Sequence, residues 1–374
     1  MSTIPIADSD TLPDQAWLVG LLSLPKLGPR RLDALVDLHG SPRNVWEKIC
    51  AGDASVRLPQ TSTAIIEKWT TSAREFSIPG RWEAMHQLGI RVAAFGDVDY
   101  PARLLVDPHA PRLVFLRGDM PSGPTVGIVG TRTCTSYGQR CAYELAKALA
   151  GAGVSVVSGL ALGIDAAAHQ GCLVDDVAAG AVPGKPIGVV GSGLDVVYPK
   201  RNRTLWENVA TNGALLGETP PGVKPAAWRF PARNRIIAGL SDAVIVIESH
   251  ATGGSLLTVD EAILRDKPIG AVPGPITSAS AQGSNRLLLD GATPVLGVED
   301  IFAMIGHSPP RKVDAEDAAD VSSTVLDAVG WSPLLFEQLC LRVAMSPGQI
   351  AAEVEQLCLQ GLLEQSGPWI ERVR

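Results

Sequence analysis

Val126-Gly-Ile-Val-Gly-Thr-Arg-Thr133 is a short apolar run that ends in a glycine turn and an arginine. Residues 137–152 follow with apolar side chains at helical spacing, so the stretch predicts a buried strand, a tight turn and a helix. Five more short apolar runs come after it, mostly with a helical pattern between neighbours. Buried strands that alternate with helices are typical of a parallel α/β sheet. The predicted strands are residues 126–129, 154–157, 187–190, 214–216, 243–247 and 269–272.

Small residues and arginine follow these predicted strands. Gly130-Thr131-Arg132 comes after the first strand, residues 158–163 after the second and Gly191-Ser192-Gly193 after the third. In an open parallel sheet, ligands bind beyond the carboxyl ends of the strands. Because glycine has no Cβ, a ligand can approach the backbone closely at such turns. The sequence therefore predicts a binding site along this edge of the sheet.

The stretch Phe230-Pro-Ala-Arg-Asn-Arg-Ile-Ile-Ala-Gly-Leu-Ser241 carries two arginines near a predicted helix start. Pro231 suits the first turn of a helix, where free backbone N–H groups and the helix dipole favour an anion. Two interpretations are open for Arg233 and Arg235. They help to bind a phosphate, or they are solvated at an exposed helix start.

The distribution of charge favours phosphate binding. The net charge of the 374 residues is −7, which by itself argues against a nucleic-acid partner. The acidic excess lies in residues 296–374, however, and residues 199–235 contain seven basic and two acidic residues. This basic segment follows two predicted strand ends, where phosphate would bind. Aromatic side chains that could stack on bases lie among the basic ones, although Trp206 can equally face the core; they are Tyr198, Trp206, Trp228 and Phe230.

Composition and spacing exclude several classes of protein. With 46% hydrophobic and 19% charged residues, the chain is expected to be globular with a large core. It has no apolar run of membrane-spanning length and no signal-peptide pattern, so we expect a cytoplasmic protein without membrane insertion. The six cysteines lack C-x-x-C spacing, which predicts reduced thiols and no metal site. Leu194, Asp195 and Val196 stand where the dinucleotide fingerprint needs its third glycine, and the P-loop spacing is absent, so we expect no cofactor.

Two regions precede the central strands. Residues 1–75 have helical periodicity around Leu24-Pro-Lys-Leu-Gly-Pro-Arg30, which resembles the turn of a helix-hairpin-helix or sterile-alpha-motif (SAM) unit, with Trp17, Trp46 and Trp69 in its core. That turn can offer backbone N–H groups to a phosphate, or the unit only packs. Residues 76–306 form the predicted extended sheet domain, in which additional strands at 92–95 and 113–116 lie against the main sheet.

Two more regions follow the sheet domain. Residues 307–323 form an acidic linker that contains Pro309 and Pro310, and residues 324–374 have the element order of a winged helix. Because an acidic recognition surface would repel phosphate, we expect this module to bind protein or only to pack. The side chains expected outward on its third helix are Gln349, Glu353, Gln356 and Gln360.

The sheet region contains, in order, Ser158-Gly-Leu-Ala-Leu-Gly-Ile-Asp165 with His169, Gly191-Ser-Gly-Leu-Asp195 with Tyr198-Pro-Lys200 and Asn202, Phe230-Pro-Ala-Arg-Asn-Arg235, Ser255-Leu-Leu-Thr258 and Val272-Pro-Gly274. Together these motifs resemble the DNA-processing protein A (DprA/Smf) family. The resemblance implies an α/β fold with an extended Rossmann-like parallel sheet that binds single-stranded DNA without catalysis. It also implies a homodimer formed through that fold, and the loading of the RecA recombinase during natural transformation.

The resemblance also implies which residues contact DNA. Four basic positions would line the DNA pocket, a glycine turn would let a phosphate approach, and two asparagines could donate to a phosphate or a base edge. The roles of Asp165 and His169 stay open, because the carboxylate could be the base of a hydrolase, a helix cap or the partner of an arginine. The expected single-stranded DNA-binding residues are Arg132, Gly191, Ser192, Gly193, Lys200, Asn202, Arg233, Asn234 and Arg235.

An enzyme is the alternative. Gly253 and Gly254, with Thr258 and Glu261, are similar to the Gly-Gly-x-Gly-Thr-x-x-Glu site of the nucleotide phosphoribohydrolases, which share a Rossmann-like sheet and use glutamate for ribosyl cleavage. One residue too many separates the glycine pair from the threonine. Gly253 also stands where the DNA-processing family commonly has a serine, and the segment 175–185 is longer than usual for that family. A partner protein that binds no nucleic acid is the third function considered.

Overall fold

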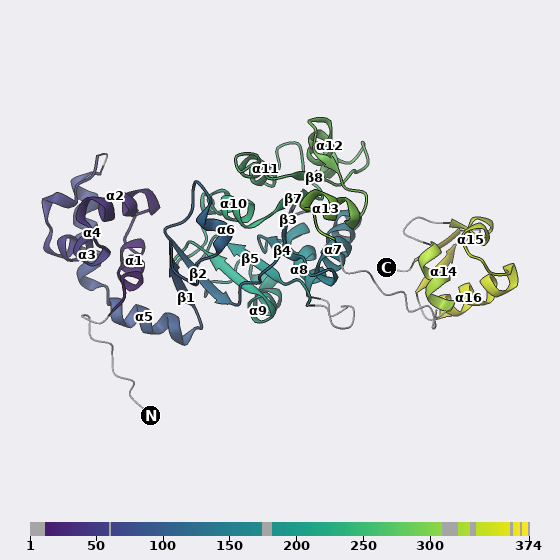
Figure 1. Ribbon diagram of the computed structural model, residues 1–374, viewed down its shortest axis with the longest axis horizontal. Helices are drawn as coiled ribbons and strands as arrows, with labels where there is room; N and C mark the ends of the chain where they lie inside the picture. Colours follow the sequence, from purple (N-terminus) through teal and green to yellow (C-terminus); the bar gives the residue numbers. More distant parts are fainter. Residues whose placement is uncertain are drawn as a thin grey trace, which may run out of the picture. The chain divides into compact units, whose positions relative to one another are not determined.

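The computed structural model describes residues 12–59, 61–173, 182–308, 321–329, 334–359, 362–366 and 369–372 (Figure 1). The chain divides into two compact units, residues 1–310 and 311–374. Each unit has a hydrophobic core of its own.

Within the described part of the first unit, nine strands form one sheet in the order β1-β2-β6-β5-β4-β3-β7-β8-β9 (Figure 1). The strands from β6 to β9 are parallel, whereas β1 and β2 add to the β6 edge in antiparallel fashion. The predicted extended Rossmann-like sheet and its two additional strands are thus confirmed. The strands are β1 (Arg91–Ala94), β2 (Leu113–Gly118), β3 (Thr125–Val129), β4 (Ser155–Ser158), β5 (Pro186–Val190), β6 (Ala214–Gly217), β7 (Ala243–Val246), β8 (Ile269–Ala271) and β9 (Thr293–Pro294).

The direction of strand addition reverses between β3 and β7. From β3 the chain adds β4, β5 and β6 on one side, and it then returns to add β7, β8 and β9 on the other. In Rossmann-like folds such a reversal leaves a crevice at the carboxyl ends of the two central strands. The residues that follow β3 and β7 are therefore in the place where a ligand would bind.

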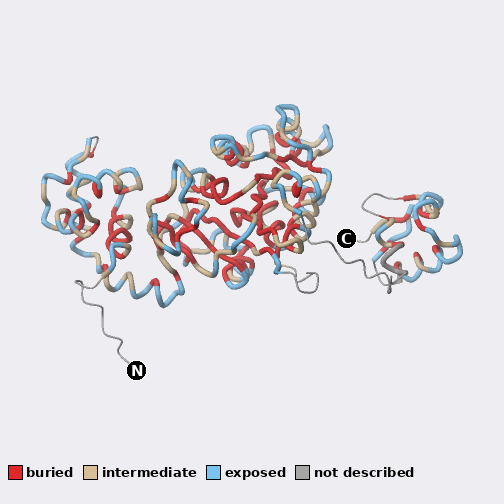
Figure 2. Tube along the Cα trace, viewed as in Figure 1, coloured by how far each residue is buried: buried red, intermediate tan, exposed pale blue. Residues whose placement is uncertain are grey.

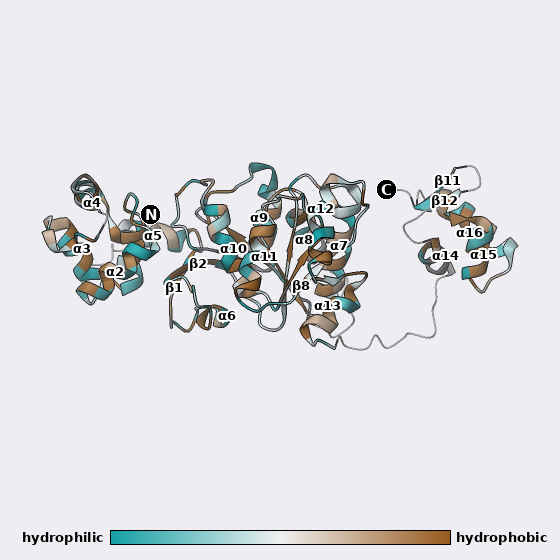
Figure 3. Ribbon diagram, turned by 90° about the horizontal axis from the view of Figure 1, so that it is seen from above, coloured by the Kyte–Doolittle hydropathy of each residue, from teal (hydrophilic) through white to brown (hydrophobic). Residues whose placement is uncertain are grey.

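Helices cover both faces of the sheet because the strands are apolar on both sides (Figures 2 and 3). Buried side chains of alternate strand positions contact one set of helices or the other. On one face lie α7 (Ser136–Gly151), α8 (Ile164–Cys172) and α13 (Val298–Ile305). On the other face lie α6 (Ala102–Leu105), α10 (Arg229–Leu240) and α11 (Leu256–Ile263). The remaining helices of the sheet region are α9 (Arg203–Asn212) and α12 (Gln282–Leu289).

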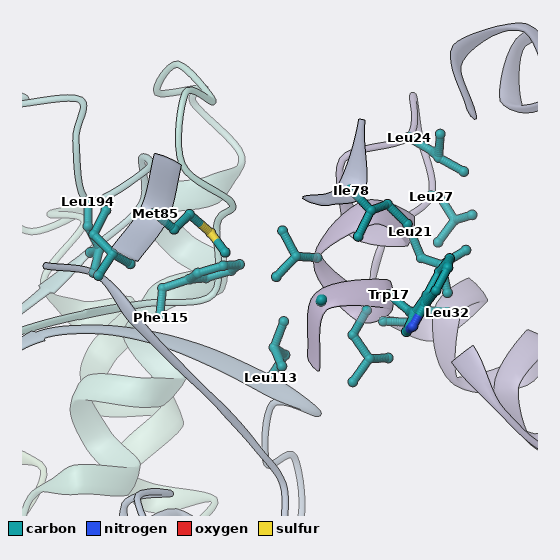
Figure 4. Close-up of a cluster of buried hydrophobic side chains, with 14 of the residues drawn as sticks. Trp17, Leu21, Leu24, Leu27, Leu32, Ile78, Met85, Leu113, Phe115 and Leu194 are labelled. Carbon is teal, nitrogen blue, oxygen red and sulfur yellow. The ribbon is translucent and has the colours of Figure 1, made fainter. Parts of the chain in front are cut away.

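The N-terminal helices share a core with the sheet. Trp17, Trp46 and Trp69 are buried as predicted, and the Trp69 indole donates a hydrogen bond to the carbonyl of Pro25 at 2.8 Å, within the turn between the first two helices. Figure 4 shows Met85 beside Phe115 of β2, in the cluster that also contains Trp17. The helical region continues past residue 75, because Ser77 caps a further helix. The helices are α1 (Asp14–Leu22), α2 (Pro29–His39), α3 (Pro42–Ala51), α4 (Thr63–Glu75) and α5 (Ile78–Gln87).

The second unit has the helix and strand order of a winged helix, as predicted. Its helices enclose a small apolar core, and its strands pair in the order β10-β12-β11. Gln349 and Gln356 are exposed, Glu353 is partly buried, and Gln360 and most of the predicted acidic linker lie outside the described residues. The elements are α14 (Val321–Val329), β10 (Leu334–Leu335), α15 (Phe336–Arg342), α16 (Pro347–Leu359), β11 (Leu363–Ser366) and β12 (Trp369–Arg372).

No helix in the described part of the chain combines the length and the apolar character needed to cross a bilayer.

Candidate functional site

A pocket of about 710 Å³ lies at the carboxyl ends of β3 and β7, where the strand order reverses. The turn after β3 forms one wall with Gly130, Thr131 and Arg132. Helix α10 and residues 225–227 form a second wall, and residues 253–258, before and within α11, form a third. The pocket is thus in the crevice that this class of fold offers to ligands.

Arg132 and two aromatic rings form a stack at this pocket. The Arg132 guanidinium lies over the ring of Phe230, 5.3 Å from its centroid, and Phe230 stacks on Tyr198 with centroids 5.4 Å apart and planes 29° apart. Arg132 is exposed, and Tyr198 is 42% exposed. Such a stack offers a positive charge to phosphates and flat faces to bases.

The other two aromatic candidates differ in their surroundings. Trp228 is 64% exposed, and the Arg229 guanidinium lies 4.9 Å from the centroid of its ring. Trp206 is fully buried, and its indole N–H donates to the carbonyl of Leu194 at 3.3 Å. The core interpretation of Trp206 is therefore confirmed, whereas Trp228 is an exposed ring, as Tyr198 is.

Arg233 forms part of the pocket floor and holds two strand ends together. It is only 8% exposed, and its Nη1 donates to the carbonyl of Gly159 at 2.8 Å and to the carbonyl of Val189, while its Nε donates to Asn234 Oδ1 at 3.2 Å. Burial lowers the pKa of Arg233 to about 10, which leaves it charged at neutral pH. The predicted helix start is thus present, but Arg233 lies within the protein instead of projecting into solvent.

Asp165 and His169 lie buried beside Arg233. Asp165 Oδ2 accepts hydrogen bonds from the backbone N–H groups of Gly159 at 3.1 Å and Ala161 at 3.4 Å. Burial raises the pKa of this carboxyl, and the charge of Arg233 opposes that rise. Burial lowers the pKa of His169 to about 4, so its imidazole is neutral at physiological pH. Asp165 therefore holds the turn after β4 and faces an arginine, which is one of the roles left open by the sequence.

Arg235 lies away from the pocket. Its Nη2 forms an ion pair with Glu218 at 2.5 Å, and its Nη1 donates to the carbonyl of His109 at 2.5 Å. Because residues two apart on a helix point in different directions, only one of the two arginines of α10 can face the pocket. The structure assigns that place to Arg233.

The glycine turn after β5 contacts its own chain. Gly193 N–H donates to the carbonyl of Val223 at 2.9 Å, and Ser192 Oγ donates to the carbonyl of Val196 at 2.8 Å. A Cβ on Gly193 would lie 2.8 Å from the carbonyl oxygen of Pro220. Gly191, Ser192 and Gly193 therefore permit close packing of the segment that leads to the pocket wall at residues 225–227.

Two other predicted residues lie near Tyr198. Asn202 is buried, and its side-chain amide donates to the carbonyls of Leu160 at 2.9 Å and Ala161 at 3.1 Å. Lys200 is exposed in the short turn Lys200–Asn202. Of the predicted residues, the structure brings Arg132, Arg233 and Asn234 into the pocket lining. His250 and Leu257 also line the pocket, although neither is among the expected DNA contacts; Leu257 lies within the motif Ser255-Leu-Leu-Thr258.

The glutamate needed by the alternative enzyme is engaged elsewhere. Glu261 forms an ion pair with Arg265 at 2.6 Å, and Arg265 forms a second, buried ion pair with Asp107 at 2.6 Å. Glu261 is not part of the pocket lining, although Gly253, Gly254 and Thr258 are. Among the described residues, no cluster of three or more His, Cys, Asp or Glu side chains is arranged to hold a metal ion.

The fold and the pocket define a Rossmann-like α/β protein with its ligand crevice at the strand-order reversal. Residues 91–306 match the family described as DNA recombination-mediator protein A, and residues 309–367 match the DprA winged helix domain. The chain therefore belongs to the DNA recombination-mediator protein A (DprA/Smf) family, which confirms the resemblance found in its sequence.

Relatives agree over most of the chain. Protein Smf of Escherichia coli (strain K12) is 37% identical over 284 residues, which cover 73% of this chain and 73% of that protein. The DNA processing protein DprA of Bacillus subtilis (strain 168) is 37% identical over 239 residues, or 63% of this chain and 77% of that protein. The X-ray structure of DNA processing protein A from Streptococcus pneumoniae superposes with a TM-score of 0.61 at 29% identity, and the match covers 77% of this chain and 97% of that one.

Proposed function

We propose that this chain binds single-stranded DNA in the pocket between β3 and β7, protects it, and helps to load a RecA recombinase onto it during natural transformation. The observation that carries the proposal is the stack of Arg132 on Phe230 and Tyr198 at the carboxyl edge of the sheet. The relatives from Bacillus subtilis and Streptococcus pneumoniae are named as DNA processing proteins, which supports the same role.

The proposed contacts divide into direct and indirect ones. Arg132 and Lys200 are exposed, so their charges can meet the phosphates of a strand that lies across Tyr198. Trp228 and Tyr198 can stack on bases without regard to sequence. The remaining proposed residues shape the site from within or beside it. Six of them already form hydrogen bonds within the protein: Ser192, Gly193, Asn202, Arg233, Asn234 and Arg235. At the seventh, Gly191, a Cβ would lie 3.3 Å from the carbonyl oxygen of Arg229.

The proposed role is binding without cleavage. Asp165, the carboxylate in the pocket lining, is held by two backbone N–H groups and lies near the charge of Arg233. Both hydrogen bonds hold the turn after β4, so the contacts of Asp165 favour a structural role over that of a general base. We further propose that two copies act together as a homodimer, so that each holds a strand while RecA binds the same DNA.

Titration of a fluorescent oligothymidine at two salt concentrations tests the proposal. We expect salt-dependent binding, and we expect the double variant Arg132→Ala/Lys200→Ala to reduce the slope of log affinity against log salt by roughly 1.4, about 0.7 for each phosphate that is no longer neutralised. Lys68→Ala removes an exposed charge from α4 and is the matched control, with an unchanged slope expected. An unchanged slope in the double variant would remove both residues from the interface.

A second measurement addresses RecA. Adding the protein to single-stranded DNA covered by a single-strand-binding protein should shorten the lag before RecA begins to hydrolyse ATP, and the double variant should lose this effect. If the lag is the same with and without the protein, the loading role is wrong, even where DNA binding is present.

A further inference from the structure

Glu248 is a buried carboxylate beside the pocket that the proposed DNA contacts do not use. It follows β7 and is 2% exposed. Its Oε2 accepts a hydrogen bond from the backbone N–H of Thr135 at 2.9 Å, and its Oε1 accepts one from the Thr135 hydroxyl at 2.6 Å and one from Ser280 Oγ at 3.3 Å. Burying a carboxylate costs free energy unless hydrogen bonds replace those it made with water. These contacts therefore allow Glu248 to be buried.

The carboxylate lies at the N-terminus of α7. Thr135 is the N-cap of this 16-residue helix, and its hydroxyl accepts the N–H of Gly138 at 3.1 Å. A Cβ on Gly138 would lie 2.4 Å from Glu248 Oε2, so the missing side chain makes room for the carboxylate. Free N–H groups and the helix dipole make such an end attractive to anions. Glu248 provides the anion from within the chain.

In dinucleotide-binding Rossmann folds, the same helix end holds the pyrophosphate. That seat lies at the start of the helix that follows the strand at the strand-order reversal. In this chain the corresponding unit is β3, the turn after it and α7. The side chain of Glu248 therefore occupies the place where a nucleotide phosphate would bind.

Glu248 also holds both ends of the turn that carries Arg132. Its backbone carbonyl accepts the N–H of Thr131 at 2.8 Å, and its carboxylate accepts the N–H of Thr135. We propose that Glu248 is a positioning residue for DNA binding: an internal anion in the phosphate seat of α7 that holds Arg132 over Phe230. The effect of Glu248 on DNA binding rests on the proposed function, whereas its place as an anion at the N-terminus of α7 does not.

Acetate tests the inference directly. Glu248→Ala removes Cγ, Cδ and both oxygens, which are the heavy atoms of one acetate ion. We expect the variant to lose roughly 5 °C or more in Tm and about tenfold in affinity for oligothymidine, the equivalent of one charge-assisted hydrogen bond. Millimolar acetate, exchanged for chloride at constant ionic strength, should restore much of both in the variant and change neither in the wild type.

Two further variants act as controls. Asp300→Ala tests whether acetate stabilises the protein in general. It removes a carboxylate that accepts the N–H groups of Leu296 and Gly297 near the start of α13, so it should lower Tm. Acetate that acts only at the site of Glu248 should not restore the Tm of this variant. Glu248→Gln keeps the shape of the side chain and should fold even if the alanine variant does not. Its amide replaces one acceptor oxygen by a donor that faces Thr135, so it should weaken DNA binding, and acetate should not restore it because the seat is full.

Each outcome decides. If acetate restores neither Tm nor DNA affinity in Glu248→Ala, the anion seat is wrong. Recovery of Tm without recovery of DNA affinity, or wild-type affinity in Glu248→Gln, overturns the positioning role. Should the wild type itself show no salt-dependent binding to oligothymidine, the proposed function fails, and the Tm measurement in acetate still decides whether Glu248 fills the seat.

Discussion

Gly130-Thr131-Arg132 and Gly191-Ser192-Gly193 each begin with a glycine directly after a buried parallel strand. The first turn lines the pocket and presents an exposed arginine, whereas the second packs against residues 220–223 of its own chain. The difference follows from position in the sheet, because β3 borders the strand-order reversal and β5 lies two strands away from it. A glycine after a strand indicates that some group lies close to the backbone there. The position of the strand in the sheet decides whether that group belongs to a ligand or to the protein itself.

The same contrast separates two arginines. Arg132 belongs to the turn after β3, which lines the pocket, and its guanidinium lies on the ring of Phe230. Arg233 is buried and donates to the carbonyls of Gly159 and Val189, at the ends of β4 and β5. One arginine is therefore expected to act on the ligand and the other on the framework. The variants below separate these two kinds of effect.

Replacing Arg233 should have the largest effect. Arg233→Ala leaves two carbonyls without their donor and removes the positive charge that faces Asp165, so we expect a loss of about 3–5 kcal/mol in the free energy of unfolding. Urea denaturation measures it. Arg233→Lys keeps the charge without the planar fork and should lose less. If Arg233→Ala is as stable as the wild type and only DNA binding falls, the assignment of Arg233 to the framework is wrong.

The next largest loss of stability should come from adding a methyl group to the turn after β5. In Gly193→Ala the added Cβ would lie 2.8 Å from the carbonyl oxygen of Pro220 and 2.9 Å from the Cα of Pro221, so we expect a loss of about 3 kcal/mol. Gly254→Ala is the matched control, because Gly254 lines the pocket and a Cβ there meets nothing within 4 Å. Equal stabilities of the two variants in urea would contradict the packing role of the turn after β5.

Acid should destabilise the protein through His169. Burial lowers the pKa of its imidazole to about 4, so the unfolded chain, with an ordinary histidine pKa, takes up the proton first. The contribution of His169 to stability is therefore complete above about pH 6.5 and is lost as the pH falls towards 4. Relative to His169→Asn, the wild type should lose about 2 kcal/mol between pH 7 and pH 5.

The nearby carboxylate acts in the opposite sense. Burial raises the pKa of Asp165, so its contribution to stability increases as the pH falls. The comparison with His169→Asn removes this background, since both proteins retain Asp165. Identical slopes of unfolding free energy against pH in the two proteins would show that His169 is not buried as a neutral ring.

Much of this architecture follows from sequence pattern alone. The six central strands, the two additional ones and the winged helix are predicted because apolar runs and helical spacing are local properties. The sequence pattern does not predict which face of α10 points to the pocket. Arg233 and Arg235 are equivalent in the sequence, and only the packing of α10 places Arg233 in the pocket lining and Arg235 beside Glu218. The role of Glu248 cannot be predicted from the sequence either. It depends on the contact between Glu248 and the start of α7, which only the fold creates.

The smallest expected effect concerns the way in which Arg132 acts. Arg132→Lys keeps the positive charge, so the salt dependence of oligothymidine binding should not change, but it removes the flat guanidinium that lies on Phe230. We expect a loss of about 0.5–1 kcal/mol in binding free energy. A double-mutant cycle with Phe230→Leu isolates that contact: once the ring is gone, Arg132→Lys should cost nothing further. If the two losses simply add, the ring of Phe230 does not contribute to the way in which Arg132 binds DNA, and the stack is wrong as the basis of that contact.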